Sequence, residues 1–152
     1  MKRRDALVLL ALLPATVSAQ PSPIAVNVFK NADCGCCGEW VKHLETAGFR
    51  VKVTNVTDTA PVRSRLGMPE RYGSCHTATV EGYVLEGHVP ATDVHRLLKT
   101  RPKALGLAVP GMPVGSPGME VGDRVDRYEV LLVPRIGDAS VFARYPNRGA
   151  RT

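Results

Sequence analysis

The stretch IAVNVFKNADCGCCGEWVKHLETAG, residues 24–48, decides the fold of this chain. Residues 24–29 are rich in β-formers, and residues 38–47 place their apolar side chains, among them Trp40, at helical spacing. Gly48 follows as a helix-ending glycine. The stretch therefore predicts a strand, a turn that carries three cysteines, and a helix.

The alternation of strand and helix continues beyond this unit. The expected elements are a strand over 49–56, a helix over 61–66, strands over 77–80 and 83–85, and a helix over 91–100. Together with the first strand and helix they have the order β-α-β-α-β-β-α. This order predicts an α/β protein with a thioredoxin-like fold.

A loop rich in glycine, proline and methionine follows, ALGLAVPGMPVGSPGMEVG over residues 104–122. Its glycines and prolines are too dense for a helix or a strand, while its apolar side chains provide surface to bury. We therefore expect an ordered lid over the cysteines, packed through Leu105, Leu107, Val109 and Val114. Strands over 128–133 and 140–143 then form a C-terminal extension.

The first 19 residues have the pattern of an export signal. Basic residues 2–4 precede an apolar run over 6–14, which is too short to span a bilayer, and small residues lead to Ala19. Arg3 and Arg4 leave both the general and the twin-arginine export routes open. We expect a single domain over 20–152 in the periplasm, an oxidising compartment, without a stable membrane anchor after cleavage.

Composition excludes several classes of protein. Hydrophobic residues make up 44% of the 152 residues and charged residues 22%, as in ordinary globular domains. The formal net charge is +6, yet the chain has no block of five or six basic residues and no basic stripe interleaved with aromatics. We therefore expect no nucleic-acid partner.

The four cysteines carry the chemical signal. Cys34 and Cys37 form a C-x-x-C pair at the expected start of a helix, a position that favours thiolates. In the predicted fold Cys75 faces this turn, at a position where thiol-disulfide oxidoreductases carry a cis-proline, so the four thiols should meet. In a purely structural reading a bridge within the turn would join Cys34 to Cys37 and leave Cys36 for Cys75.

Clustered thiolates, supplemented by thioethers or imidazoles, select Cu(I), whereas Zn(II) prefers regularly spaced pairs of ligands. Three cysteines within four residues suit thiolates that bridge several copper ions, while zinc and an iron-sulfur cluster stay open as alternatives. The additional candidate ligands are His88, Met112 and Met119. The alternatives are a backbone-bonded histidine at a helix entry and methionines that fill the core.

The other histidines and Met68 are weaker candidates. His76 should point away from Cys75 if both lie in one strand, because side chains alternate along a strand. His43 and His95 lie among polar neighbours in expected helices and should be solvated. Met68 should pack at the end of a helix.

The motifs NADCGCCGEW, SCHTA, EGHVPA and GLAVPGMPVGSPGME resemble the CopG-like family of periplasmic copper-resistance proteins, also known as domain of unknown function 411. The resemblance spans residues 24 to about 145. It implies a thioredoxin-like fold and a role in Cu(I)/Cu(II) handling. It also implies copper binding by a C-x-C-C motif and a fourth cysteine, which match Cys34, Cys36, Cys37 and Cys75.

The sequence thus predicts a periplasmic protein that binds Cu(I) in a cysteine-rich, multinuclear site. It would sequester copper, cycle it between Cu(I) and Cu(II), or pass it to other periplasmic copper-handling proteins, so carrier and copper oxidoreductase both stay open. Two further alternatives remain. One is a thiol-disulfide oxidoreductase with Cys34 as nucleophile and Cys37 as resolving thiol, and the other is a disulfide-stapled interaction domain without a cofactor.

Overall fold

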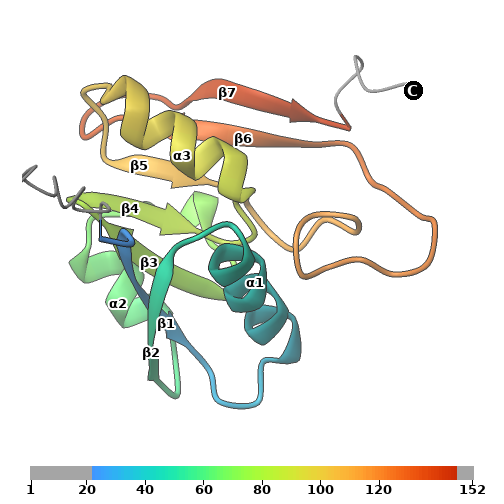
Figure 1. The fold of residues 1–152 in the computed structure, drawn as a ribbon. Coiled ribbons are helices and arrows are strands. Elements are labelled where there is room, and N and C mark those ends of the chain that lie inside the picture. The colour runs from blue at the N-terminus through green and yellow to red at the C-terminus, as the bar shows by residue number, and fades with distance from the viewer. Residues whose placement is uncertain (1–21, 147–152) are drawn as a thin grey trace, which may run out of the picture.

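The computed structural model describes residues 22–146, so the predicted signal over residues 1–19 lies outside the described residues. Seven strands form one sheet in the order β2-β1-β3-β4-β5-β6-β7 (Figure 1). The strands are β1 (Ala25–Lys30), β2 (Arg50–Asn55), β3 (His76–Val80), β4 (Tyr83–Glu86), β5 (Gly106–Ala108), β6 (Tyr128–Val133) and β7 (Ser140–Tyr145). The helices are α1 (Gly35–Thr46), α2 (Ala60–Arg65), the 3-10 turn η1 (Glu70–Tyr72) and α3 (Ala91–Thr100).

The predicted order of the elements is confirmed from β1 to α3. The sheet is mixed: β1 is parallel to β2 and antiparallel to β3, and β4 is parallel to β5. Helix α1 begins at Gly35, earlier than the expected start at Gly38, because the Gly38 N–H already bonds to the Cys34 carbonyl oxygen. The protein is therefore an α/β protein as expected, while its thioredoxin-like classification stays a prediction.

The expectation of an irregular loop over residues 104–122 is wrong for residues 106–108, which form strand β5. Gly106 makes this strand possible, because a Cβ at this position would lie 1.7 Å from the Val84 carbonyl oxygen of the paired strand β4. Leu107 is fully buried in the core. The glycine that suggested a loop is therefore the residue that allows two backbones to approach closely.

Apolar side chains alternate between the two faces of the sheet. Leu85 belongs to a core that also holds Trp40 and Leu44 of α1 and residues of α3, and the neighbouring Val84 belongs to a second cluster around Met68 and Tyr72. The helices α1 and α3 thus cover one face, and the segment of α2 and η1 covers the other. Met68 packs after the end of α2, as predicted.

The C-terminal strands are tied to α3. The Tyr145 hydroxyl donates to Asp93 Oδ2 at 2.6 Å, and the Arg96 guanidinium lies 3.8 Å from the ring centroid of Phe142. These contacts place β7, the edge strand of the sheet, beside α3 (Figure 1). Within residues 22–146 no helix combines the length and apolar character needed to cross a membrane.

Candidate metal centre

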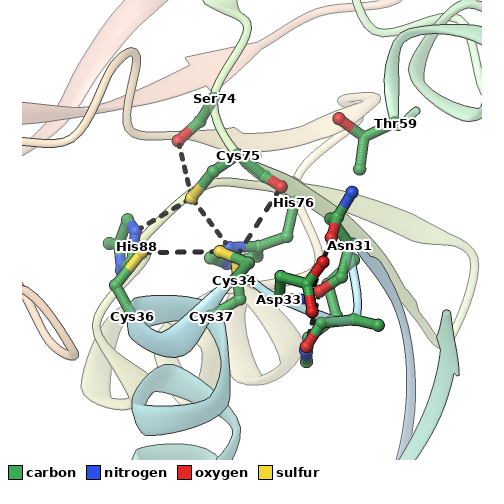
Figure 2. The surroundings of a disulfide bond; sticks show 12 residues. Asn31, Asp33, Cys34, Cys36, Cys37, Thr59, Ser74, Cys75, His76 and His88 are labelled. Carbon is green, nitrogen blue, oxygen red and sulfur yellow. Dashed lines mark hydrogen bonds between the residues drawn. A yellow bond between two sulfur atoms is a disulfide. The ribbon is translucent and has the colours of Figure 1, made fainter. Parts of the chain in front are cut away.

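The register of the central strands brings three loops together at one end of the sheet. Strands β1 and β3 are antiparallel, with Lys30 opposite His76, and β3 and β4 are antiparallel as well. The turn after β1 carries Cys34, the residue before β3 is Cys75, and the loop after β4 carries His88. Residues more than 50 positions apart in the chain therefore share one site (Figure 2).

The predicted meeting of the four sulfur atoms is confirmed, since the Sγ atoms of all four cysteines lie within 4.8 Å of one another. Cys34 caps α1, and Cys36 and Cys37 lie in its first turn. Cys34 and Cys37 form a disulfide, and Cys36 and Cys75 are free thiols. The Cys36 sulfur lies 3.5 Å from that of Cys34. The bridge within the turn is the one that the purely structural alternative contains, whereas the second bridge of that alternative, between Cys36 and Cys75, is not formed.

Cys75 and His88 form a short polar chain that ends on the backbone. His88 is fully buried, and its Nδ1 lies 2.8 Å from the Pro117 carbonyl oxygen. A carbonyl can only accept, so Nδ1 carries the proton and the lone pair of Nε2 faces the Cys75 sulfur, 3.2 Å away. Burial, and secondarily the Cys36 thiol, raises the pKa of Cys75 to about 11. The Cys75 thiol is therefore protonated and donates to His88.

The expectation that His76 points away from Cys75 is wrong. Cys75 precedes β3 and does not lie in it, so strand alternation does not apply, and His76 Nδ1 lies 3.4 Å from the Cys75 sulfur. The His76 ring packs 4.3 Å from the Trp40 ring and is fully buried. Its Nε2 has no hydrogen-bond partner among residues 22–146. Burial, and secondarily His88, lowers the pKa of His76 to about 3, so the imidazole is neutral.

The loop after β5 covers this side of the site. A Cβ at Gly118, which has a positive φ of 86°, would lie 2.7 Å from the Cys36 carbonyl oxygen and from the Trp40 backbone nitrogen. Together with the bond from His88 to Pro117, this contact places residues 117–118 against the start of α1. The predicted lid is therefore confirmed for these residues. Of the residues expected to anchor it, Leu105, Leu107 and Val109 are buried and Val114 is half-buried.

The two candidate methionines lie in the loop between β5 and β6, one before and one after residues 117–118. Met112 is 53% exposed and follows Gly111, whose N–H bonds to the Gly73 carbonyl oxygen near Cys75. Met119 is half-buried and follows Gly118 near the start of α1. Both thioethers thus belong to segments that flank the cysteines, and their role as ligands stays a prediction.

His43 differs from expectation. It is half-buried, and its Nε2 accepts the backbone N–H of Ala91 at the first residue of α3, so it links two helices. Burial lowers its pKa, partly opposed by Glu120. The exposed His95 bonds to the Ala47 carbonyl oxygen and stacks on Phe49. The helical periodicity of the sequence does not predict either contact.

A buried ion pair, which the sequence does not predict, lies behind Cys75. Arg63 of α2 and Glu86 at the end of β4 are 4% and 0% exposed, and Arg63 Nε donates to Glu86 Oε1 at 2.8 Å. The only signal in the sequence is an acidic residue at the end of the apolar run Tyr83–Leu85. Such a residue usually marks the exposed end of a strand, so its burial could not be anticipated.

The donor set fits a soft metal ion. With the disulfide reduced, four thiols converge and the lone pair of His88 Nε2 faces one of them, that of Cys75; thiolates with an imidazole are ligands for Cu(I) and Zn(II). Closing the disulfide removes two of these thiolates, so the number of metal donors depends on the redox state. The fold and the site therefore define an α/β protein with a cluster of four cysteines that could hold a metal.

Comparison with known proteins is consistent with this class. The family model described as protein of unknown function DUF411 matches residues 72–119. Two solved structures of copper resistance protein CopG, form 2 and form 1, are each 53% identical to this chain and cover 82% of it. Their TM-scores are 0.78 and 0.77, and the match covers 99% and 98% of their own chains. A search of the curated proteins gives no match. This chain belongs to the CopG family of copper-resistance proteins.

Proposed function

We propose that this protein is an exported copper-resistance protein that binds Cu(I) through Cys34, Cys36, Cys37 and Cys75. The observation that carries the proposal is the approach of all four sulfur atoms to within 4.8 Å of one another. The relatives named for copper resistance favour copper over zinc as the metal. Three cysteines in one helical turn suit thiolates that bridge several ions better than four separate corners around one ion.

His88 completes the donor set. Its Nδ1–H is held by Pro117, so Nε2 is directed at the Cys75 sulfur without a change of rotamer. Cu(I) arriving at Cys75 displaces the thiol proton, because the thiolate is the metal ligand. A hydrogen bond to the distal nitrogen orients the imidazole and raises its basicity. Met112 and Met119 supply thioethers from the covering loop, which shields the bound copper from water.

The Cys34–Cys37 pair gives the site a means of cycling copper. When these two thiolates join in a disulfide they release two electrons, and two Cu(II) ions take them up to become two Cu(I) ions. In the reverse direction two Cu(I) ions reduce the disulfide to two thiolates. Copper is the only redox partner that this balance needs.

The second candidate function is thiol-disulfide exchange on other proteins, and the disulfide at the start of α1 favours it. In that case Cys34 attacks and Cys37 resolves. The position that docks a substrate disulfide in such enzymes carries Ser74-Cys75-His76 here, with no proline. The copper function accounts for all four cysteines, whereas exchange uses two.

Metal analysis of protein from copper-supplemented cells, purified with its thiols kept reduced, tests the proposal. We expect bound copper in the wild type and a sharp loss in each single Cys→Ser variant, because bridging thiolates act as one unit. Unchanged copper in Cys36→Ser and Cys75→Ser, together with rapid reduction of insulin, would establish the exchange function instead. Cell fractionation of the full chain tests export, with the periplasmic fraction as the expected location.

A further inference from the structure

Cys75 occupies a part of the chain that the sheet does not hold directly. It lies between η1 and the first paired residue of β3, His76, which is opposite Lys30. By contrast, the other three cysteines lie at the start of a regular helix. The position of the Cys75 sulfur relative to the other three therefore depends on what holds residues 73–75.

Ser74 is held on both sides of its peptide backbone by two buried side chains. Its N–H donates to Glu86 Oε1 at 2.7 Å, and its carbonyl oxygen accepts from Arg63 NH2 at 2.8 Å. The two side chains are also bonded to each other. Arg63 and Glu86 thus form a clamp on the residue that precedes Cys75, and we call this pair the Ser74 clamp.

Every charged group of the Ser74 clamp is used. The remaining Glu86 oxygen, Oε2, accepts from the Thr77 hydroxyl at 2.6 Å in strand β3. Arg63 NH1 donates to both carboxylate oxygens of Glu70 in η1, at 2.8 and 2.7 Å. The clamp therefore connects α2, η1, β3 and β4 directly behind the site, and it fixes the chain on either side of Cys75.

The close approach of Ser74 to β4 requires a glycine at position 87. A Cβ there would lie 2.6 Å from Ser74 Oγ and 2.4 Å from the Val109 carbonyl oxygen, and Gly87 has a φ of 71°. Gly87 follows Glu86 and precedes His88. The same short segment therefore carries one half of the clamp, the space for Ser74, and the imidazole that faces Cys75.

The net stabilisation expected from the pair does not explain its presence. Taking two charges out of water costs about as much as their attraction returns, and replacing a buried pair by apolar residues is often neutral or stabilising. The pair instead fixes the position of the groups bonded to it, because a guanidinium and a carboxylate form hydrogen bonds in only a few geometries. Apart from a 3.4 Å contact of Arg63 with Thr59 at the start of α2, the partners outside the pair are Ser74, Thr77 and Glu70, which lie in the segments before and after Cys75.

We propose that Arg63 and Glu86 are positioning residues of the metal centre, which hold the Cys75 thiol within bridging distance of the three helix cysteines and of His88. The inference rests on the proposed copper function. The clamp touches neither the sulfur atoms nor the metal, and it acts only through the backbone of Ser74 and the ends of β3 and β4.

The test compares Cu(I) affinity in competition with a Cu(I) chelator for wild type, Arg63→Lys and Glu86→Gln, all fully reduced. Arg63→Lys keeps the positive charge but loses the planar guanidinium that binds two partners at once. Glu86→Gln keeps the size of the side chain but loses the negative charge. We expect Cu(I) binding about 10 to 100 times weaker, as for other residues that orient metal ligands. Asp93→Asn is the matched control, since Asp93 is a 4% exposed carboxylate bonded to Arg96 and Tyr145 near the β7 edge of the sheet and takes no part in the clamp.

Thermal unfolding of the metal-free proteins accompanies the affinities. A double variant, Arg63→Met with Glu86→Leu, provides a folded protein without a buried lone charge if either single variant unfolds. We expect it to lose Cu(I) affinity to the same extent. If the clamp variants lose thermal stability as Asp93→Asn does while binding Cu(I) like the wild type, the positioning role is wrong.

A second readout needs no copper. With the Cys34–Cys37 disulfide closed, Cys36 and Cys75 are the free thiols, and a bifunctional alkylating reagent that spans a few ångströms should bridge them. We expect a severalfold lower yield of the bridged product in the clamp variants and an unchanged yield in Asp93→Asn. A wild type that binds no copper would overturn the proposed function, while the bridging yields would still decide on the clamp.

Discussion

The two halves of the cysteine centre are built in different ways. Cys34, Cys36 and Cys37 lie at the start of α1, where the helix backbone sets their spacing. A Cβ at Gly38 in this turn would meet no described atom within 4 Å beyond its chain neighbours and the local helix backbone. Cys75 is held by contacts with segments distant in the chain, and the neighbouring Gly87 would accept no Cβ without displacement of Ser74 or Val109. The first half should therefore tolerate small changes that the second half does not.

The sharpest test of this contrast is a pair of glycine substitutions. Gly87→Ala adds a Cβ at 2.4 Å from a backbone oxygen and at a positive φ, and should destabilise the metal-free protein by about 2 to 4 kcal/mol. Gly38→Ala should raise stability by about 0.4 to 1 kcal/mol, because alanine favours the helix. Chemical denaturation measures both, and Cu(I) affinity should fall only in Gly87→Ala. Equal effects at the two positions would refute the contrast.

The covering loop offers a second comparison. Gly118→Ala places a Cβ 2.7 Å from backbone atoms of Cys36 and Trp40, so residues 117–118 must move away and His88 loses its Pro117 acceptor. We expect faster loss of Cu(I) to a chelator and a loss of about 1 to 3 kcal/mol of stability. At Gly111 a Cβ would meet no described atom within 4 Å beyond its chain neighbours. Gly111→Ala should therefore lower stability only through the backbone strain of an alanine at a φ of 69°. A Gly118→Ala protein that retains Cu(I) as long as Gly111→Ala does would show that the loop does not shield the site.

The methionines should have a smaller effect, confined to copper. Met112→Leu and Met119→Leu keep the apolar volume and remove the sulfur donor, so we expect severalfold weaker Cu(I) retention with little change in the melting temperature of the metal-free protein. The single and double variants are compared with wild type by chelator competition. If all three retain Cu(I) as tightly as wild type, the thioether role is wrong and the loop is only a cover.

The smallest expected effect is a pH dependence at His43, away from the cysteines. The neutral imidazole accepts the Ala91 N–H, and burial lowers its pKa below the usual value near 6.5, with Glu120 opposing. The unfolded chain therefore binds a proton more readily than the folded protein. Stability due to His43 is fully present above pH 6.5 and is lost as the pH falls below it.

Denaturation of the reduced, metal-free protein at pH 7.5 and pH 5.5 measures this loss. His43→Gln keeps an acceptor near Ala91 but does not titrate in this range, so it should show a smaller difference between the two pH values than the wild type. An identical pH dependence in both proteins would assign the effect to other groups.

Local periodicity predicted much of the fold. The residues of α3 and β6 match the expected ranges, and the other predicted helices and strands are found with shifted ends. The meeting of Cys75 with the C-x-C-C turn was also predicted, because the order of the elements implies which strand ends are neighbours. The contact between His76 and Cys75 was not predicted. Cys75 lies just before the strand, and a shift of one residue reverses the face of the sheet on which a side chain is expected.

The sequence by itself determined the order of strands and helices and the cysteine-rich helix start, because these depend on neighbours within a few residues. Only the tertiary structure decided that Gly106 pairs in a strand, that His43 joins two helices, and that Arg63 and Glu86 hold Ser74. These features depend on atoms from segments far apart in the chain. A glycine, a histidine or a glutamate has the same local preferences in either setting, and its role is set by the backbone that packing brings to it.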